Sequence, residues 1–205
     1  MLFLIKSCTI NTRLPQWLRK TIQFIAVISI FNVSLCLAEE NSIEEYQIKA
    51  VYLFNFALFF TWPNYTFKHP SQAFRICILG QNPYGIDLEL VVENETVEGH
   101  QVIVQPIRSV YRSQRCQMLF VSQSERSRLA NIFAYIQRYP ILSVSDIKGF
   151  AQQGGMIEFF NTPYNEVRFI IAPEAVNEAN LLASANLLEI AQIFYRSRTN
   201  PYENF

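Results

Sequence analysis

The stretch ILSVSDIKGFAQQGGMIEFFN, at 141–161, constrains the fold more than any other part of the chain. Its apolar start, ILSV, is typical of a buried strand, and Ser145 or Asp146 can cap a following short helix through side-chain oxygens. Gly154 and Gly155 suit the end of that turn, because glycine adopts the positive φ that a helix stop often requires. MIEFFN predicts a second strand. The stretch therefore predicts either one edge of an α/β ligand crevice or a plain βαβ corner without chemistry.

The first 38 residues have the pattern of a secretory signal peptide. Four basic residues and no acidic one precede Glu39, and the largely apolar run from Ile22 ends in small residues at Ala38. We therefore predict cleavage after Ala38. The alternative is an N-terminal membrane anchor, for which this run is marginal because a spanning helix needs ~20 apolar residues. A lipoprotein cut before Cys36 is disfavoured, because Leu35 is bulky where a small residue is expected.

Removal of residues 1–38 leaves 167 residues with 13 basic and 17 acidic side chains, a formal charge of −4. That charge argues against a nucleic-acid binder, which needs a positive field. A chain of this length fits one domain, which we place at 39–196, and buries roughly 70% of its unfolded surface. The polar segment 197–205 is predicted to be a flexible tail.

Strand-like runs alternate with helical patterns along residues 39–196. The alternation predicts an α/β fold, a single-domain Rossmann-like three-layer sandwich with helices on both faces of a mostly parallel sheet of about six strands. The runs at 156–160 and 166–171 flank a turn at 162–165, so we expect an antiparallel hairpin at one edge of the sheet.

The first helix of this domain is expected to begin at a capping box formed by Ser42 and Glu45. Its run from Ala50 to Phe60 contains only one polar residue, Asn55, and is too short to cross a bilayer. We expect this helix either to be fully buried or to pack on both the sheet and a partner.

Two cysteines, Cys77 and Cys116, remain after removal of the signal peptide. An even pair in an exported chain is most simply a disulfide. The closed loop of 40 residues would stabilise the fold by roughly 4 kcal/mol in the chain-entropy model. The alternative is a pair of buried free thiols.

Motifs for catalysis, cofactors and metals are absent from the sequence. It has no H-E-x-x-H or C-x-x-C spacing, nucleophile elbow, Walker loop or G-x-G-x-x-G, and His69 and His100 stand in loop-like contexts. Asp146 and Glu158 lack a partner for acid–base chemistry, so we interpret them as a helix cap and a solvated strand residue. We predict no catalytic residue, no cofactor and no metal site.

Polar residues follow three of the predicted strands and form a candidate ligand crevice. In an open α/β sheet such strand ends converge, and the helix N-termini there offer N–H groups to a small polar or anionic ligand. The same residue types are also what ordinary caps and turns require. The candidate crevice residues are Gly80, Gln81, Ser122, Ser145 and Asp146.

A second candidate site is an apolar patch on the segment after the last long strand. Several asparagine, serine and proline residues punctuate this segment, so it is not expected to form one smoothly buried helix. Large apolar side chains on such a segment would mark a partner-binding surface. The alternative is that they cap the core. The candidate partner-binding residues are Val176, Leu181, Leu182 and Leu187.

Several segments occur in one order along the chain: YQIKAVYLFNFALFFTWP, FRICILG, CQMLFVS, ILSVSDIKGFAQQGGMIEFF, and VRFII with the later LLASANLLEIA. Together they resemble the YfiR family of exported bacterial proteins over about residues 43–195. The aromatic helix that ends in Trp-Pro and the SD-x-x-GF…GGMIEF stretch are the most specific parts. Ala185-Asn186 departs from the pattern, since a Ser-Lys pair is common there, which leaves partner contacts in that region open.

The resemblance implies a periplasmic α/β protein without catalytic activity, in which Cys77 and Cys116 match a disulfide pair of the family. Its better known members bind the periplasmic sensor domain of a membrane diguanylate cyclase and repress it, and an outer-membrane lipoprotein can sequester the repressor. We therefore expect an exported regulator that lowers cyclic di-GMP synthesis, with that cyclase, such a lipoprotein and a second copy of the chain as partners. The alternative is a periplasmic small-ligand binding module that serves another membrane receptor through the crevice.

Export can be tested by the intact mass of the protein recovered from the periplasm. We expect the mass of residues 39–205, because the small residues before Glu39 suit a signal peptidase. A mass that still includes Met1 to Ala38 would contradict cleavage and favour the anchor.

Overall fold

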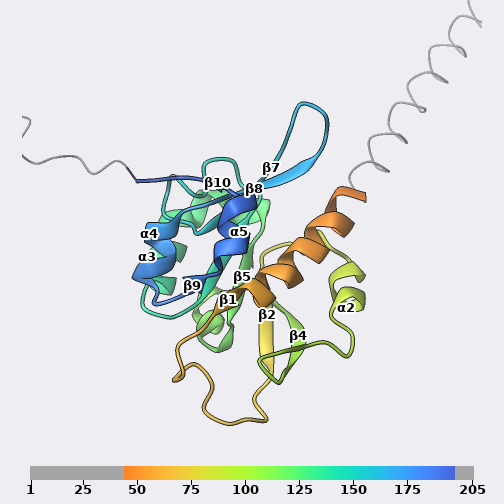
Figure 1. The fold of residues 1–205 in the computed structure, drawn as a ribbon, viewed down its shortest axis with the longest axis vertical. Helices are drawn as coiled ribbons and strands as arrows, with labels where there is room; N and C mark the ends of the chain where they lie inside the picture. The colour runs from red at the N-terminus through yellow and green to blue at the C-terminus, as the bar shows by residue number, and fades with distance from the viewer. Residues whose placement is uncertain (1–43, 197–205) are drawn as a thin grey trace, which may run out of the picture. The chain divides into compact units, whose positions relative to one another are not determined.

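Eight strands form the central sheet of the structure, a computed structural model that describes residues 44–196 (Figure 1). The predicted signal peptide at 1–38 and the predicted tail at 197–205 lie outside the described residues. Residues 44–59 form the first helix, after which the elements follow in chain order. They are β1 (Phe60–Thr61), β2 (Phe74–Leu79), α2 (Asp87–Val91), β3 (Thr96–Val97), β4 (His100–Ile107), η1 (Val110–Arg115), β5 (Met118–Val121), η2 (Gln123–Arg128), α3 (Leu129–Ile136), β6 (Leu142–Ser145), β7 (Ile157–Asn161), β8 (Val167–Ile171), α4 (Pro173–Glu178), β9 (Leu182–Ala183), α5 (Ala185–Ile190) and β10 (Gln192–Ile193).

The sheet has the strand order β10-β8-β7-β6-β5-β2-β4-β3. Strands β4, β2, β5, β6 and β7 are mutually parallel, whereas β8 is antiparallel to β7 and β3 is antiparallel to β4. If these five parallel strands are numbered 1 to 5 in chain order, their order in the sheet is 2-1-3-4-5. This is the order of one common doubly wound α/β arrangement.

The sheet carries a separate apolar core on each face, because successive side chains of a strand point to opposite faces. One core joins the first helix, α2, α4 and α5 to Phe74, Ile76 and Phe120 of the sheet. The other joins α3 to Cys77 and Leu119, the alternate positions of the same strands. Helices thus cover both faces, and in Figure 1 the first helix (orange) crosses in front of the strands.

The first helix buries one side against the sheet and leaves the other exposed. Phe56 is fully buried, stacks on Phe159 and meets Phe169 edge-on, with ring centroids 5.6 and 5.0 Å away. Val51 and Leu58, on the other side, are about half exposed. Of the two expectations for this helix, full burial is therefore wrong. In the part of the chain that the structure describes, no helix is long and apolar enough to cross a membrane.

The predicted α/β class and the mostly parallel sheet are confirmed, but the number of strands is wrong. The sheet has eight strands rather than about six, because β3 and β10 add two residues each at its two ends. The predicted hairpin exists as β7 and β8, yet it does not form the edge, since β10 pairs with β8. Strands of two residues carry no periodic signal, so they arise only from tertiary contacts.

The stretch 141–161 folds as β6, a series of hydrogen-bonded turns and β7, so the two predicted strands are present but the short helix between them is not. The Ser145 hydroxyl accepts from the N–H of Ile147 at 3.0 Å and donates to the carbonyl of Val121 at 2.6 Å, so it both caps the turn and ties it to β5. Gly154 has a φ of +116°. Gly155 is required for a different reason: a Cβ there would lie 2.1 Å from the ring of Phe150.

The disulfide between Cys77 and Cys116 is present and joins β2 to the residues that lead into the neighbouring strand β5, with the two Cα atoms 5.9 Å apart. Both cysteines are buried in the core beneath α3. The bond closes a loop that contains β4, the sheet neighbour on the other side of β2, and thus stabilises the centre of the sheet.

Replacing both cysteines by serine should lower the free energy of unfolding by about 2–5 kcal/mol, because the unfolded chain regains the entropy of a long loop. Urea denaturation of the variant measures the change, and wild-type protein unfolded with a reductant should show a similar loss. Two reactive thiols in the unreduced wild-type protein would contradict the bond.

Candidate functional site

A buried ion pair joins the first helix to the carboxyl end of β6. The Lys49 ammonium lies 3.1 Å from Oδ2 of Asp146, and the two side chains are only 3% and 7% exposed. The Tyr46 hydroxyl donates to the same oxygen at 2.6 Å, and the Gln123 amide donates to Oδ1 at 3.1 Å. Lys49 also pairs with Glu45, one helical turn earlier. Asp146 is therefore satisfied by groups of this chain.

Two tyrosines beside Asp146 are held in the protonated form. Burial, followed by the hydrogen bond to Asp146, raises the pKa of Tyr46 above its ordinary value. Burial and then the Asp146 charge raise the pKa of Tyr84 as well, and its ring meets that of Tyr46 edge-on with centroids 5.6 Å apart. Because phenols already ionise near pH 10, Tyr46 remains a hydrogen-bond donor to Asp146 throughout the physiological range.

Glu158 on β7 is a buried cap rather than the solvated strand residue that the sequence indicated. It is 4% exposed, and its two carboxylate oxygens accept from the N–H groups of Gly149 at 2.9 Å and Ala151 at 3.0 Å. These N–H groups belong to the helical turn after β6, where a negative charge compensates unpaired donors. Glu158 thereby fixes the turn of the 141–161 stretch.

An open cavity of about 810 Å³ lies beside this network, at the carboxyl ends of β6 and β7. Lys49, Asp146 and Glu158 line it together with the first helix and the turn after β6. Glu45, Lys49, Asp146 and Glu158 are already paired with one another or with backbone N–H groups, whereas the exposed Lys148 takes part in none of the salt bridges of the described residues. Among residues 44–196, no group of three or more His, Cys, Asp or Glu side chains is arranged to hold a metal ion.

The predicted ligand-crevice residues do lie at neighbouring strand ends, but mostly not around an open space. The N–H of Gln81 donates to Ser124 Oγ at 3.0 Å, and a Cβ at Gly80 would lie 2.4 Å from that same oxygen. Ser122 and Ser145 are buried. Only Asp146 lines the carboxyl-end cavity. The polar groups therefore close the crevice by bonding one another, which is the alternative that caps and turns already suggested.

The predicted partner-binding residues do not form one exposed patch, and for three of the four that expectation is wrong. Val176, Leu181 and Leu187 are 2%, 0% and 2% exposed and belong to the core under the first helix. Leu182 is 64% exposed. The asparagine and serine residues that suggested an irregular surface act as turns and caps: Asn180 has a φ of +57°, and Ser184 Oγ accepts from the N–H of Leu187.

An exposed apolar surface does exist, on the outward side of the first helix. We call it the apolar face and define it as Ile48, Val51, Leu58, Phe59 and Leu182, which are 37–64% exposed. At about 100° per residue, the four helical positions fall on one side of the helix. Leu182 joins them because β9 pairs with β1, directly after the helix, and Ser184 N–H donates to the carbonyl of Phe59.

Comparison with protein families agrees with this architecture. A family model described as YfiR/HmsC-like matches residues 46–192, from the first helix to the start of β10. The chain belongs to the YfiR/HmsC-like family. No curated protein matches it. The matched region contains the Lys49–Asp146 pair, the disulfide and the apolar face, so the features described above lie within the family domain.

Sequence reasoning missed the link between Lys49 and Asp146. A signal existed, because Lys49 immediately precedes the apolar run of the first helix and would need an acidic partner if buried. The sequence offered several candidate carboxylates, and only the fold brings Asp146 to it across 97 positions.

Asp146→Asn should lower the free energy of unfolding by about 3 kcal/mol, because it leaves a buried ammonium with Glu45 as its remaining charged partner among the described residues. Urea denaturation checks this value. Arg168→Gln is the control, since it removes only an exposed pair with Glu166 and should cost less than about 1 kcal/mol. Equal stability of Asp146→Asn and wild type would show that the pair does not fix the helix.

Proposed function

We propose that the protein is an exported, non-enzymatic regulator that binds the periplasmic domain of a transmembrane diguanylate cyclase and represses cyclic di-GMP synthesis. Membership of the YfiR/HmsC-like family across residues 46–192 carries this proposal. The disulfide supports an oxidising compartment such as the periplasm, because disulfides persist there and are rare in the cytosol.

Repression follows from a difference in affinity for two states of the cyclase. A bound protein shifts an equilibrium only by as much as its affinities for the two states differ. The regulator therefore binds the inactive arrangement of the periplasmic domain more tightly, and its release lets the cyclase return to the active arrangement.

The apolar face is the surface that we assign to cyclase binding. Exposed large apolar side chains that lie together mark protein interfaces more often than scattered ones do. Four of its five residues stand on one rigid helix, which the Lys49–Asp146 pair and the buried aromatic rings hold on the sheet. A rigid apolar helix side offers contact area at a low cost in conformational entropy.

A small-ligand binding module is the second candidate function, favoured by the cavity of about 810 Å³ at the carboxyl ends of β6 and β7. Its size falls within the range of small-molecule sites. We rank it second because its charged groups, apart from the exposed Lys148, already have partners in this chain.

Two variants of the apolar face, Val51→Asp and Leu182→Asp, test the proposed function. Both side chains are about half exposed or more, so each change should alter the free energy of unfolding by only about 0.5 kcal/mol. Each should nevertheless abolish capture of the cyclase from solubilised membranes and raise cellular cyclic di-GMP, because an aspartate would be desolvated without a partner in the interface.

Two controls separate binding from folding. Tyr164→Asp changes an 87% exposed residue between β7 and β8 that does not belong to the apolar face, and it should leave both the melting temperature and repression unchanged. Leu181→Asp places a charge at a fully buried position and should unfold the protein. If Val51→Asp and Leu182→Asp both fold and repress normally, the cyclase binds elsewhere.

A further inference from the structure

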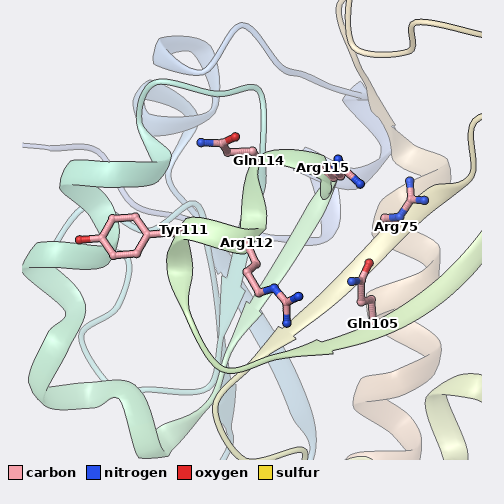
Figure 2. Close-up of a pocket in the computed structure, with 6 residues that line it drawn as sticks. All are labelled: Arg75, Gln105, Tyr111, Arg112, Gln114 and Arg115. Carbon is pink, nitrogen blue, oxygen red and sulfur yellow. The ribbon is translucent and has the colours of Figure 1, made fainter.

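A basic cavity lies at the amino-terminal side of the central strands (Figure 2). Its volume is about 380 Å³, and three arginines and two glutamines line it together with one tyrosine. Figure 2 shows that these side chains come from β2, β4 and η1, with Arg112 and Arg115 on the side of Arg75 and Gln105 and with Tyr111 pointing the other way, toward α3. We define the basic cavity by its lining residues, Arg75, Gln105, Tyr111, Arg112, Gln114 and Arg115.

The fold brings these residues together through the sheet and the disulfide. Gln105 on β4 pairs in register with Cys77 on β2, two residues after Arg75, so Arg75 and Gln105 emerge on the same face. Cys116 holds the end of η1, which carries Arg115, against that face. The cavity is thus built on the most strongly cross-linked part of the molecule.

No carboxylate balances these arginines within the described part of the chain. None of the five salt bridges there includes Arg75, Arg112 or Arg115. The segments that build the cavity, 74–79 and 100–115, contain no aspartate or glutamate. Like charges that share a cavity repel one another, and a bound anion removes that repulsion.

An adjoining cavity of about 750 Å³ extends the positive surface. It shares Arg75 and Arg115 with the basic cavity and adds Lys68 and Arg138, again without an acidic lining residue. The predicted mature chain has a formal charge of −4. A protein with an excess of acidic residues therefore gathers five cationic side chains at one place.

We propose that the basic cavity binds a phosphate-bearing small anion. Guanidinium groups bind phosphate through paired N–H donors, and three of them match the charge of a phosphomonoester better than that of a single carboxylate. Gln105 adds an amide on the side of Arg75. The volume admits a small phosphorylated molecule or the headgroup of an anionic lipid.

This site is separate from the proposed cyclase-binding surface. None of its residues belongs to the apolar face, and none takes part in the Lys49–Asp146 network. Variants of Arg112 and Arg115 therefore change no residue of the apolar face, so failure of anion binding and failure of the proposed function can be told apart.

Calorimetric titration of the wild-type protein with glycerol 3-phosphate in low-salt chloride buffer tests the proposal. We expect saturable binding that weakens at higher salt, because exposed charges are screened. The double variant Arg112→Gln and Arg115→Gln should bind at least about tenfold more weakly, since two charge-assisted donors are lost. Both arginines are exposed, so the variant should have the same melting temperature as the wild type.

Arg108→Gln is the matched control, because it removes the same charge from the same exposed segment but lines neither cavity. It should retain wild-type affinity. Flotation with phosphatidylglycerol vesicles, compared with phosphatidylcholine vesicles, separates a lipid headgroup from a soluble phosphate, and either source must depend on Arg112 and Arg115. The proposal is overturned if neither probe binds wild type, or if the double variant binds as well as Arg108→Gln.

Discussion

The buried pair of Lys49 and Asp146 determines how the first helix lies on the sheet. A buried ammonium is tolerated only where a carboxylate and further hydrogen bonds meet it, so Lys49 must face the carboxyl end of β6. That requirement fixes the rotation of the helix about its axis. Phe56 consequently points into the aromatic cluster with Phe159 and Phe169, and Val51 points to solvent. One electrostatic contact thus helps to determine which side of the apolar run at 50–59 faces the core and which faces solvent.

The same network explains why the carboxyl edge of the sheet is not the obvious ligand site. In doubly wound folds ligands usually bind outside the carboxyl ends of the strands, where helix N-termini supply N–H donors. Here Asp146, Glu158 and Ser145 already bond those donors and the first helix. The opposite, amino-terminal side of β2 and β5 has no comparable closure, and its arginines have no acidic partner among the described residues.

The features predicted correctly from the sequence are those that depend on local hydrophobic periodicity and on capping or helix-starting residues. The strand Phe74–Leu79, the start of α4 at Pro173 and the Ser145 cap all follow from short-range patterns. Long-range outcomes were missed, because β3 and β10 exist only through their neighbours. The prediction was also wrong for Val176, Leu181 and Leu187, because the polar residues beside them were interpreted as a sign of an exposed surface. In the structure Asn180 forms a turn and Ser184 caps α5, and the three apolar side chains are buried.

The basic cavity and the apolar face are separate, but the cavity that adjoins the basic cavity comes close to the end of the apolar face. Tyr65 lines the cavity that extends the positive surface, and it also lines a smaller cavity with Thr61 and Leu182, at the end of the apolar face. An anion held by Arg75 and Arg115 would therefore change the charge beside the surface that we assign to the cyclase. Because two ligands bound to adjacent sites alter each other's affinity by the same factor, a phosphate-dependent cyclase affinity would require a cyclase-dependent phosphate affinity of equal size. Because the two surfaces lie close together, the dependence of phosphate affinity on bound cyclase, and the reverse, can be tested.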